Sequence, residues 1–162
     1  MKPISTNDSR LYGLIALYDM QTDYFFSVLE GISDTDAHNR LGTKANHVAW
    51  LAGSLVHQRY DLAAALTGKT IKHAADELFK DNQGIKDDVT YPPLEQYKLD
   101  WEKIRLPLRN ALTEADAEKL DSMFKMPGME FPYYELVSFC IYREANCIGQ
   151  IALWRRLLGY EA

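Results

Sequence analysis

The chain has 162 residues, of which 47% are apolar and 25% are charged, and its formal net charge is −5. These proportions are typical of a globular protein with one hydrophobic core, and they argue against a disordered, fibrous or membrane-embedded chain. The negative charge disfavours a nucleic-acid backbone, which attracts clustered lysine and arginine. The first ten residues lack the apolar segment of a secretion signal. We therefore predict one domain over residues 1–162, in the cytoplasm, that binds neither nucleic acid nor membrane.

Two long helices are predicted in the first half of the chain, where apolar residues recur every three or four positions. The first covers residues 8–32, and the second covers residues 44–67 and ends at Gly68. Gln21 and Thr22 interrupt the apolar stripe of the first helix. We predict that they lie at the surface, with a position facing a pocket as the alternative.

A third helix follows a long polar segment. Residues 69–93 are mostly polar and end in a proline pair, so they predict a link with room for only a short helix over residues 74–79. The third apolar stripe predicts a helix over residues 94–112. Pro107 lacks a backbone N–H, and we expect it to kink or loosen this helix.

The final third of the chain predicts a short helix and then a long one. Thr113 precedes acidic residues and is the predicted cap of the short helix. Residues 123–132 are expected to be irregular, and the last helix covers residues 133–158. The predicted fold is all-α: a four-helix bundle with a long link between helices 2 and 3 and a short extra helix before the last.

A second, polar stripe runs along two of the predicted helices, because residues three, four or seven positions apart share one helical face. In the second long helix the stripe consists of His47, Trp50, Ser54, His57 and Asp61; in the last it consists of Cys140, Arg143, Cys147, Gln150 and Trp154. If the stripes face each other, they border a polar pocket. Seven residues separate the two cysteines, about 10 Å along one helix, and this separation is too long for a disulfide.

Two segments resemble the DinB/YfiT-like family of four-helix-bundle metalloenzymes. They are NHVAWLAGSLVHQRYDLAAALTG at residues 46–68 and EANCIGQIALWRRLLG at residues 144–159. GISDTD at residues 31–36 and FPYYELVSF at residues 131–139 extend the resemblance over nearly the whole chain. The resemblance implies the same four-helix bundle, and it implies a small-molecule enzyme or a former enzyme.

Family members hold a divalent metal, Zn or Ni, with three histidines, in patterns like W-x-x-G-H on the second helix and H-E-x-x-H-x-G-Q on the last. In this chain the three histidine positions fall on Ser54, Arg143 and Cys147. Arginine has no lone pair to donate and remains protonated, and a serine hydroxyl is a poor ligand for these metals. We therefore expect no metal cofactor at this position, and we predict that the three residues form a polar pocket for a small molecule.

Nearby residues leave alternatives open. His57 is read as a surface or polar-core histidine, or as a ligand or acid–base group, whereas His38 and His73 lie in polar links and are predicted at the surface. Cys147 is read as a small buried apolar residue, or as a thiolate stabilised by Arg143. Glu144 interrupts an apolar run, so we expect it to be partly buried and hydrogen-bonded.

Further expectations concern packing and assembly. We expect Gly149 to allow close approach of helices and Gln150 to satisfy backbone groups. Family members often pair, and we predict a homodimer in which the aromatic residues Tyr12, Tyr24 and Phe26 supply contacts.

Two functions remain open from the sequence. One is a non-catalytic protein that has lost the three-histidine metal site and either binds a small, anionic ligand at Arg143 or serves as an interaction module. The other is an active metal- or thiol-dependent transferase or hydrolase that uses a variant site. The residues alone do not decide whether the protein is an enzyme.

Overall fold

The computed structural model of the protein describes residues 4–161 and is mainly helical. Its elements are, in chain order, the 3-10 helix η1 (Ser9–Leu11), α1 (Tyr12–Leu29), α2 (Asp34–Ala37), α3 (Val48–Thr67), α4 (Asp76–Phe79), the 3-10 helix η2 (Lys80–Asn82), α5 (Leu94–Glu114), α6 (Ala117–Asp121), β1 (Met123–Met126), β2 (Met129–Pro132) and α7 (Tyr133–Leu157). None of these helices is long and apolar enough to cross a membrane.

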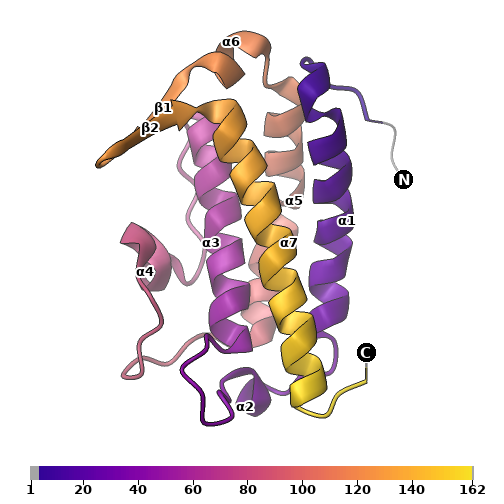
Figure 1. Cartoon of the computed structure of the whole chain (residues 1–162), viewed down its shortest axis with the longest axis vertical. Helices are drawn as coiled ribbons and strands as arrows, with labels where there is room; N and C mark the ends of the chain where they lie inside the picture. The colour runs from indigo at the N-terminus through magenta and orange to yellow at the C-terminus, as the bar shows by residue number, and fades with distance from the viewer. Residues whose placement is uncertain (1–3, 162) are drawn as a thin grey trace.

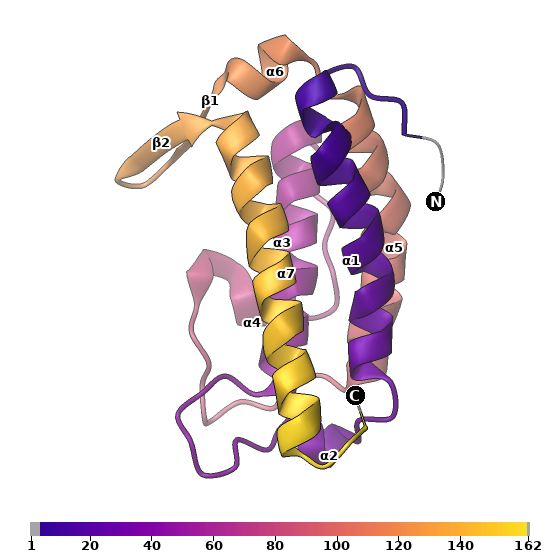
Figure 2. The same ribbon diagram turned by 45° about the vertical axis from the view of Figure 1, so that its right-hand side comes forward.

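The long helices α1, α3, α5 and α7 run side by side along the longest axis of the molecule (Figures 1 and 2). Both α1 and α3 contact α5 and α7, so each long helix packs against two others. Helices α3 and α5 run in the same direction, because residues 68–93 carry the chain back from the end of α3 to the level of its start. The sheet and α6 lie at the end where α7 begins.

The core between the long helices is rich in aromatic side chains. Trp101 of α5 and Phe25 of α1 are fully buried, and their rings stack with centroids 4.0 Å apart. The indole N–H of Trp101 donates to the main-chain carbonyl of Thr22 at 3.1 Å. Burial of such rings removes a large apolar area from water and strengthens the contact between helices, so this stack joins α1 to α5.

The prediction that Gln21 and Thr22 lie at the surface is wrong, because they are only 5% and 1% exposed. The Thr22 hydroxyl donates to the carbonyl of Tyr18 at 2.7 Å, and the Gln21 amide donates to the carbonyl of Ile141 in α7 at 3.2 Å. Buried polar groups are tolerated when they find hydrogen-bond partners. Main-chain carbonyls accept from the Gln21 amide N–H and the Thr22 hydroxyl, although Gln21 Oε1 is buried without a partner. The apolar stripe does not reveal these carbonyls.

Two helices begin at other residues than predicted, and a capping side chain explains each start. The second long helix begins at Val48 rather than at residue 44, because His47 Nδ1 accepts the N–H of Trp50 at 3.1 Å. Thr113 does not cap the short helix; it lies in the last turn of α5, which continues through Pro107. The cap of α6 is Asp116, whose side chain accepts the Lys119 N–H at 2.9 Å. An N-cap of this kind contributes about 1 kcal/mol.

The segment between α6 and α7, predicted as irregular, is a β-hairpin. Strands β1 and β2 pair antiparallel, from Met123 opposite Pro132 to Met126 opposite Met129. Gly128 in the turn has a φ of 79°, in the left-handed region that glycine adopts without steric cost. Four-residue strands are too short to give a clear alternating pattern, so the sequence did not indicate them.

The link between α3 and α5 contains the predicted short helix, as α4, but the prediction that His73 lies at the surface is wrong. His73 is 6% exposed, and its ring lies against Tyr60 of α3 with centroids 5.1 Å apart. The buried Asp100 of α5 accepts the N–H of Ala74 at 3.1 Å. The link is therefore held against α3 and α5 by contacts with residues distant in the sequence.

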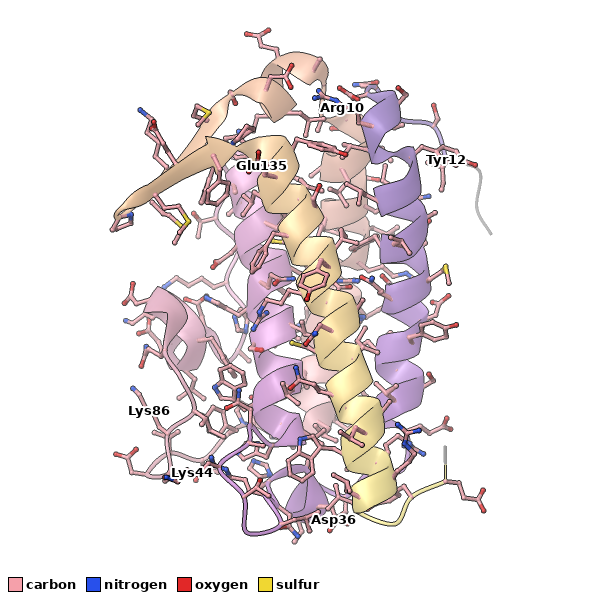
Figure 3. The ribbon with its side chains drawn as sticks, in the orientation of Figure 1. Arg10, Tyr12, Asp36, Lys44, Lys86 and Glu135 are labelled. Atoms are coloured by element: carbon pink, nitrogen blue, oxygen red, sulfur yellow. The ribbon has the colours of Figure 1, made fainter. Side chains whose placement is uncertain are left out.

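The outer face of α1 exposes Tyr12 and Tyr24 by 58% and 54%, whereas Phe26 is partly buried against the core. Tyr12 lies on the side of the molecule away from the hairpin (Figure 3). Pairing of two copies through this face stays a prediction.

Close packing at α3 depends on Gly53. A Cβ atom at this position would lie 2.3 Å from Phe79 Cζ and 2.7 Å from Tyr97 Cζ, and both rings are buried. Gly149, by contrast, is exposed on α7 and its Cβ would meet no atom within 4 Å. The close approach expected at Gly149 is therefore absent there and occurs at Gly53.

We predict that Gly53→Ala destabilises the protein by about 1–3 kcal/mol, because two buried rings would have to move. Gly149→Ala is the matched control and should stabilise by about 0.5–1 kcal/mol, since alanine favours an exposed helix interior over glycine. Urea unfolding followed by circular dichroism measures both. Equal effects of the two substitutions would contradict this packing.

Candidate functional site

A cavity of about 910 Å³ lies between α3, α7, the hairpin and the α3–α5 link. Figure 1 shows the hairpin and α4 on the same side of the molecule, next to α3. Most of the cavity lining is apolar or aromatic; it includes Trp50, Phe79, Phe124, Met126, Met129, Phe131, Leu136 and Phe139. Polar side chains join this lining at Ser54, Gln58 and Arg143. An apolar cavity with a few convergent polar groups is the usual form of a small-molecule site.

A smaller hollow, of about 470 Å³, lies between residues 74–78 and residues 90–96. Its lining offers Glu77 as its only charged side chain. The larger cavity is therefore the candidate site.

Arg143 is held in the cavity wall by two side chains of α3. Its guanidinium donates to Ser54 Oγ at 3.1 Å and to Gln58 Oε1 at 3.0 Å. Gln58 in turn donates through Nε2 to the carbonyl of Cys140 at 2.9 Å, which orients its amide. The described part of the chain places no carboxylate oxygen within 4.0 Å of Arg143. The cavity wall thus carries a positioned cation whose only partners are neutral.

Of the three residues at the family's histidine positions, the structure brings together Ser54 and Arg143. Cys147 is one turn further along α7 from Arg143; it is 5% exposed and does not belong to the cavity lining. Burial raises the pKa of the Cys147 thiol, and the nearby Arg143 only partly counters the rise. Cys140 does line the cavity, and burial raises its pKa to about 12. Both cysteines are free thiols rather than a disulfide.

Glu144 follows Arg143 on α7 but does not line the cavity, and it is 1% exposed. It pairs with the buried Arg59 of α3, in part through a contact of 3.1 Å between Glu144 Oε2 and Arg59 Nε. The Arg59 guanidinium carbon lies 3.4 Å from the ring centroid of Trp101 and 4.1 Å from that of Tyr18. Burial raises the pKa of the Glu144 carboxyl, and Arg59 opposes that rise. The expected burial and hydrogen bonding of Glu144 are both observed.

The histidines form two separate groups. His57 is partly buried in the cavity lining, and its Nδ1 lies 3.0 Å from Nε2 of His73. His47 lies at the start of α3 beside His38, with ring centroids 5.2 Å apart. Burial, together with His38 and Arg40, lowers the pKa of His47 to about 4. His47 therefore acts as a helix cap and is remote from Arg143.

Other residues of the predicted site lie outside the cavity or at its rim. Gln150 is exposed and donates to Asn146 Oδ1 at 2.7 Å instead of satisfying backbone groups. Asp61 is exposed at the rim and lies 3.2 Å from His57 Nε2. Glu135 is also exposed, near the start of α7 beside the hairpin (Figure 3).

Sequence reasoning missed three parts of this region. Gln58, four residues after Ser54, shares its helical face and could have been found from spacing. The histidine and aspartate of the link, His73 and Asp76, have a three-residue spacing, but only the folded link brings them to α3. The hairpin side chains gave no signal, because the hairpin itself was not predicted.

The chemistry available at Arg143 is recognition of an anion rather than binding of a metal. A guanidinium offers several N–H donors in a fork and no electron pair. Within residues 4–161, the side chains that could together hold a metal ion are His57, His73 and Asp76, whose ligand atoms lie within 4.8 Å of one another. A scan of protein-family models and a search of curated proteins give no match to this chain.

We predict that Glu144→Gln destabilises the protein by about 3 kcal/mol, because it leaves the Arg59 cation buried without its counter-charge. Asp19→Asn is the matched control, since Asp19 pairs with Arg109 at 2.8 Å in a more exposed setting. Its cost should be about 1 kcal/mol or less. Urea unfolding measures both, and a loss for Glu144→Gln no larger than that of the control would contradict the role of the buried pair.

Proposed function

We propose that this chain is a DinB/YfiT-like four-helix bundle that binds a small molecule and has replaced the family's three-histidine metal site. The packing of α1, α3, α5 and α7, with a long link between α3 and α5, supports this architecture. The hydrogen bond between Arg143 and Ser54 supports the replacement, because it joins two of the three family positions through a guanidinium, which has no electron pair for a metal.

The ligand that suits the cavity has an apolar body and one anionic group, such as a carboxylate or sulfonate. The apolar and aromatic lining favours the body. Arg143 favours the anion, since a guanidinium held by neutral partners keeps its charge available, and charge-assisted hydrogen bonds are the stronger kind. The observation that carries this proposal is the position of Arg143 in the cavity wall, fixed by Ser54 and Gln58.

The carboxylates at the rim do not neutralise this cation. Glu135 lies eight residues before Arg143 on α7, about 12 Å along the helix axis. Asp61 is 68% exposed and faces His57. Charges separated by about a Debye length in solvent interact weakly, so Glu135 does not cancel the charge of Arg143.

A thiol-dependent transferase is the less favoured function. A cysteine nucleophile reacts as its thiolate and needs a lowered pKa and an open path. Cys147 is buried outside the cavity and its pKa is raised. Cys140 lines the cavity, but burial raises its pKa to about 12, so neither cysteine has the character of a nucleophile.

Two fluorescent probes that differ by a sulfonate test the role of Arg143. We expect 1-anilinonaphthalene-8-sulfonate to bind the wild-type protein more tightly than neutral N-phenyl-1-naphthylamine. Arg143→Gln should weaken binding of the sulfonate probe by roughly 10- to 100-fold. This loss is equivalent to about 1.5–3 kcal/mol, the contribution of a hydrogen bond to a charged group. The neutral probe should bind the variant as it binds the wild type.

Arg156→Gln is the matched control, because Arg156 is an exposed arginine of the same helix and lies outside the cavity lining. It should change neither affinity. Equal weakening of both probes by Arg143→Gln, or no weakening of the sulfonate probe, would overturn the proposal.

Thiol modification tests the alternative function. We expect both cysteines of the native protein to react with a disulfide reagent at pH 8 at least about 100-fold more slowly than in urea, because reaction requires opening of the fold and ionisation of a buried thiol. Cys140→Ser and Cys147→Ser variants assign the rates to each thiol. Fast reaction of Cys147 in the native state would favour a thiol-dependent enzyme instead.

A further inference from the structure

Three potential metal ligands converge beside the cavity, away from the family's metal position. They are His57 of α3, His73 of the link and Asp76, the first residue of α4. His57 Nδ1 and His73 Nε2 are 3.0 Å apart, and Asp76 Oδ1 lies 3.7 Å from each of these nitrogens. Distances of 3.7 Å are too long for hydrogen bonds, so the carboxylate faces both rings without bonding to either.

The size of this triangle matches a metal ion. The point equidistant from the three atoms lies about 2.0 Å from each of them, and zinc binds histidine nitrogen and carboxylate oxygen at about 2.0–2.2 Å. Bond lengths slightly longer than this place the ion off the plane of its three ligands, as a tetrahedral ion requires, and leave its fourth position open.

The tautomer of His57 is set for ligation through Nδ1. His73 Nδ1 accepts the N–H of Ala75, so His73 carries its hydrogen on Nε2 and donates it to Nδ1 of His57 at 3.0 Å. The hydrogen of His57 is then on Nε2, which lies 3.2 Å from Asp61 Oδ2. A carboxylate near the second nitrogen is common around metal-ligating histidines, where it orients the ring and raises its basicity.

His73 can bind an ion through Nε2 only when the hydrogen on that nitrogen is displaced. Its Nδ1 accepts the N–H of Ala75 over a long 3.3 Å, which places the proton on Nε2, where it is shared with His57. A cation that binds Nε2 of His73 takes the place of the shared proton. The His73 ring then carries its hydrogen on Nδ1 and loses the hydrogen bond from the Ala75 N–H.

The ligands are positioned before any ion binds. The Asp100 carboxylate accepts the N–H of Ala74, next to His73, and also receives hydrogen bonds from Gln96 and Lys103. His73 and Asp76 have the three-residue spacing that is common for paired ligands. Folding therefore supplies much of the ordering that metal binding would otherwise require.

We propose that His57, His73 and Asp76 form a binding site for a divalent ion of the zinc type, with Asp61 as the outer partner of His57. Two neutral imidazoles and one carboxylate are a suitable donor set for such an ion. Three protein ligands leave a fourth position open. His57 and Asp61 both line the cavity, so the site borders the space that holds the proposed small-molecule ligand, yet it does not depend on Arg143.

Metal titration of the purified, chelator-treated protein tests this site. We expect one Zn²⁺ per chain by isothermal titration calorimetry, and we expect Co²⁺ to give the intense visible absorption of a four-coordinate site. His57→Gln and His73→Gln should each weaken Zn²⁺ binding by about 100-fold or more, because each removes a ligand. Asp61→Asn removes only the outer partner of His57 and should weaken Zn²⁺ binding by about 10- to 100-fold. Asp76→Asn should weaken binding as well.

His38→Gln is the matched control, because it removes a histidine of the other pair, beside His47. It should leave the affinity unchanged, and so should Arg143→Gln, so that failure here and failure of the anion site are distinguishable. If His73→Gln unfolds the protein, Asp76→Asn still decides, since this carboxylate is 24% exposed and outside the core.

Nitrogen-15 spectra of the histidine rings identify the coordinating atoms. We expect the metal at Nδ1 of His57 and at Nε2 of His73. Absence of Zn²⁺ binding by the wild-type protein would overturn the proposal and leave a histidine–histidine hydrogen bond. Stoichiometric metal lost in Cys147→Ser would also overturn it, because the ion would then occupy the family's position.

Discussion

The ion pair between Arg59 and Glu144 is the contact on which the arrangement of the four long helices depends. Arg59 belongs to α3 and Glu144 to α7, and the Arg59 guanidinium also lies against Tyr18 of α1 and Trp101 of α5. One buried cation therefore touches all four helices. A charge in a low-dielectric interior strongly disfavours any arrangement that separates it from its partner, so this contact fixes how far each helix is shifted along its neighbours.

The candidate site is a consequence of that register. Gln58 precedes Arg59 on α3, and Arg143 precedes Glu144 on α7. The inner residues of these two adjacent pairs form the buried ion pair, and the outer residues form the hydrogen bond between Gln58 and Arg143 in the cavity wall. A shift of one helix relative to the other would break both contacts together. The stability of the core and the position of the Arg143 cation are thus coupled through consecutive residues.

The two polar centres beside the cavity use different parts of the chain. Arg143 and Ser54 come from two long helices whose faces are regular, so their meeting follows from helix packing. His73 and Asp76 come from the link, which is held near His57 by the hydrogen bond from the Ala74 N–H to Asp100 and by packing of the His73 ring on Tyr60. The proposed anion site and the proposed cation site therefore depend on different contacts, and both border the same apolar cavity.

The sequence by itself determined the long helices and the polar face of α3 and α7, because helical periodicity and Gly68 are local properties of the chain. It also placed Ser54 and Arg143 on that face, and it indicated that Glu144 is buried. Only the tertiary structure decided that Gln21, Thr22 and His73 are buried, since Ile141, Trp101 and Tyr60, which contact them, are distant in the sequence. The same holds for the hairpin over the cavity and for the meeting of His57 with Asp76. Local patterns report which face of a helix is apolar, but which distant groups meet is fixed by packing of the whole chain.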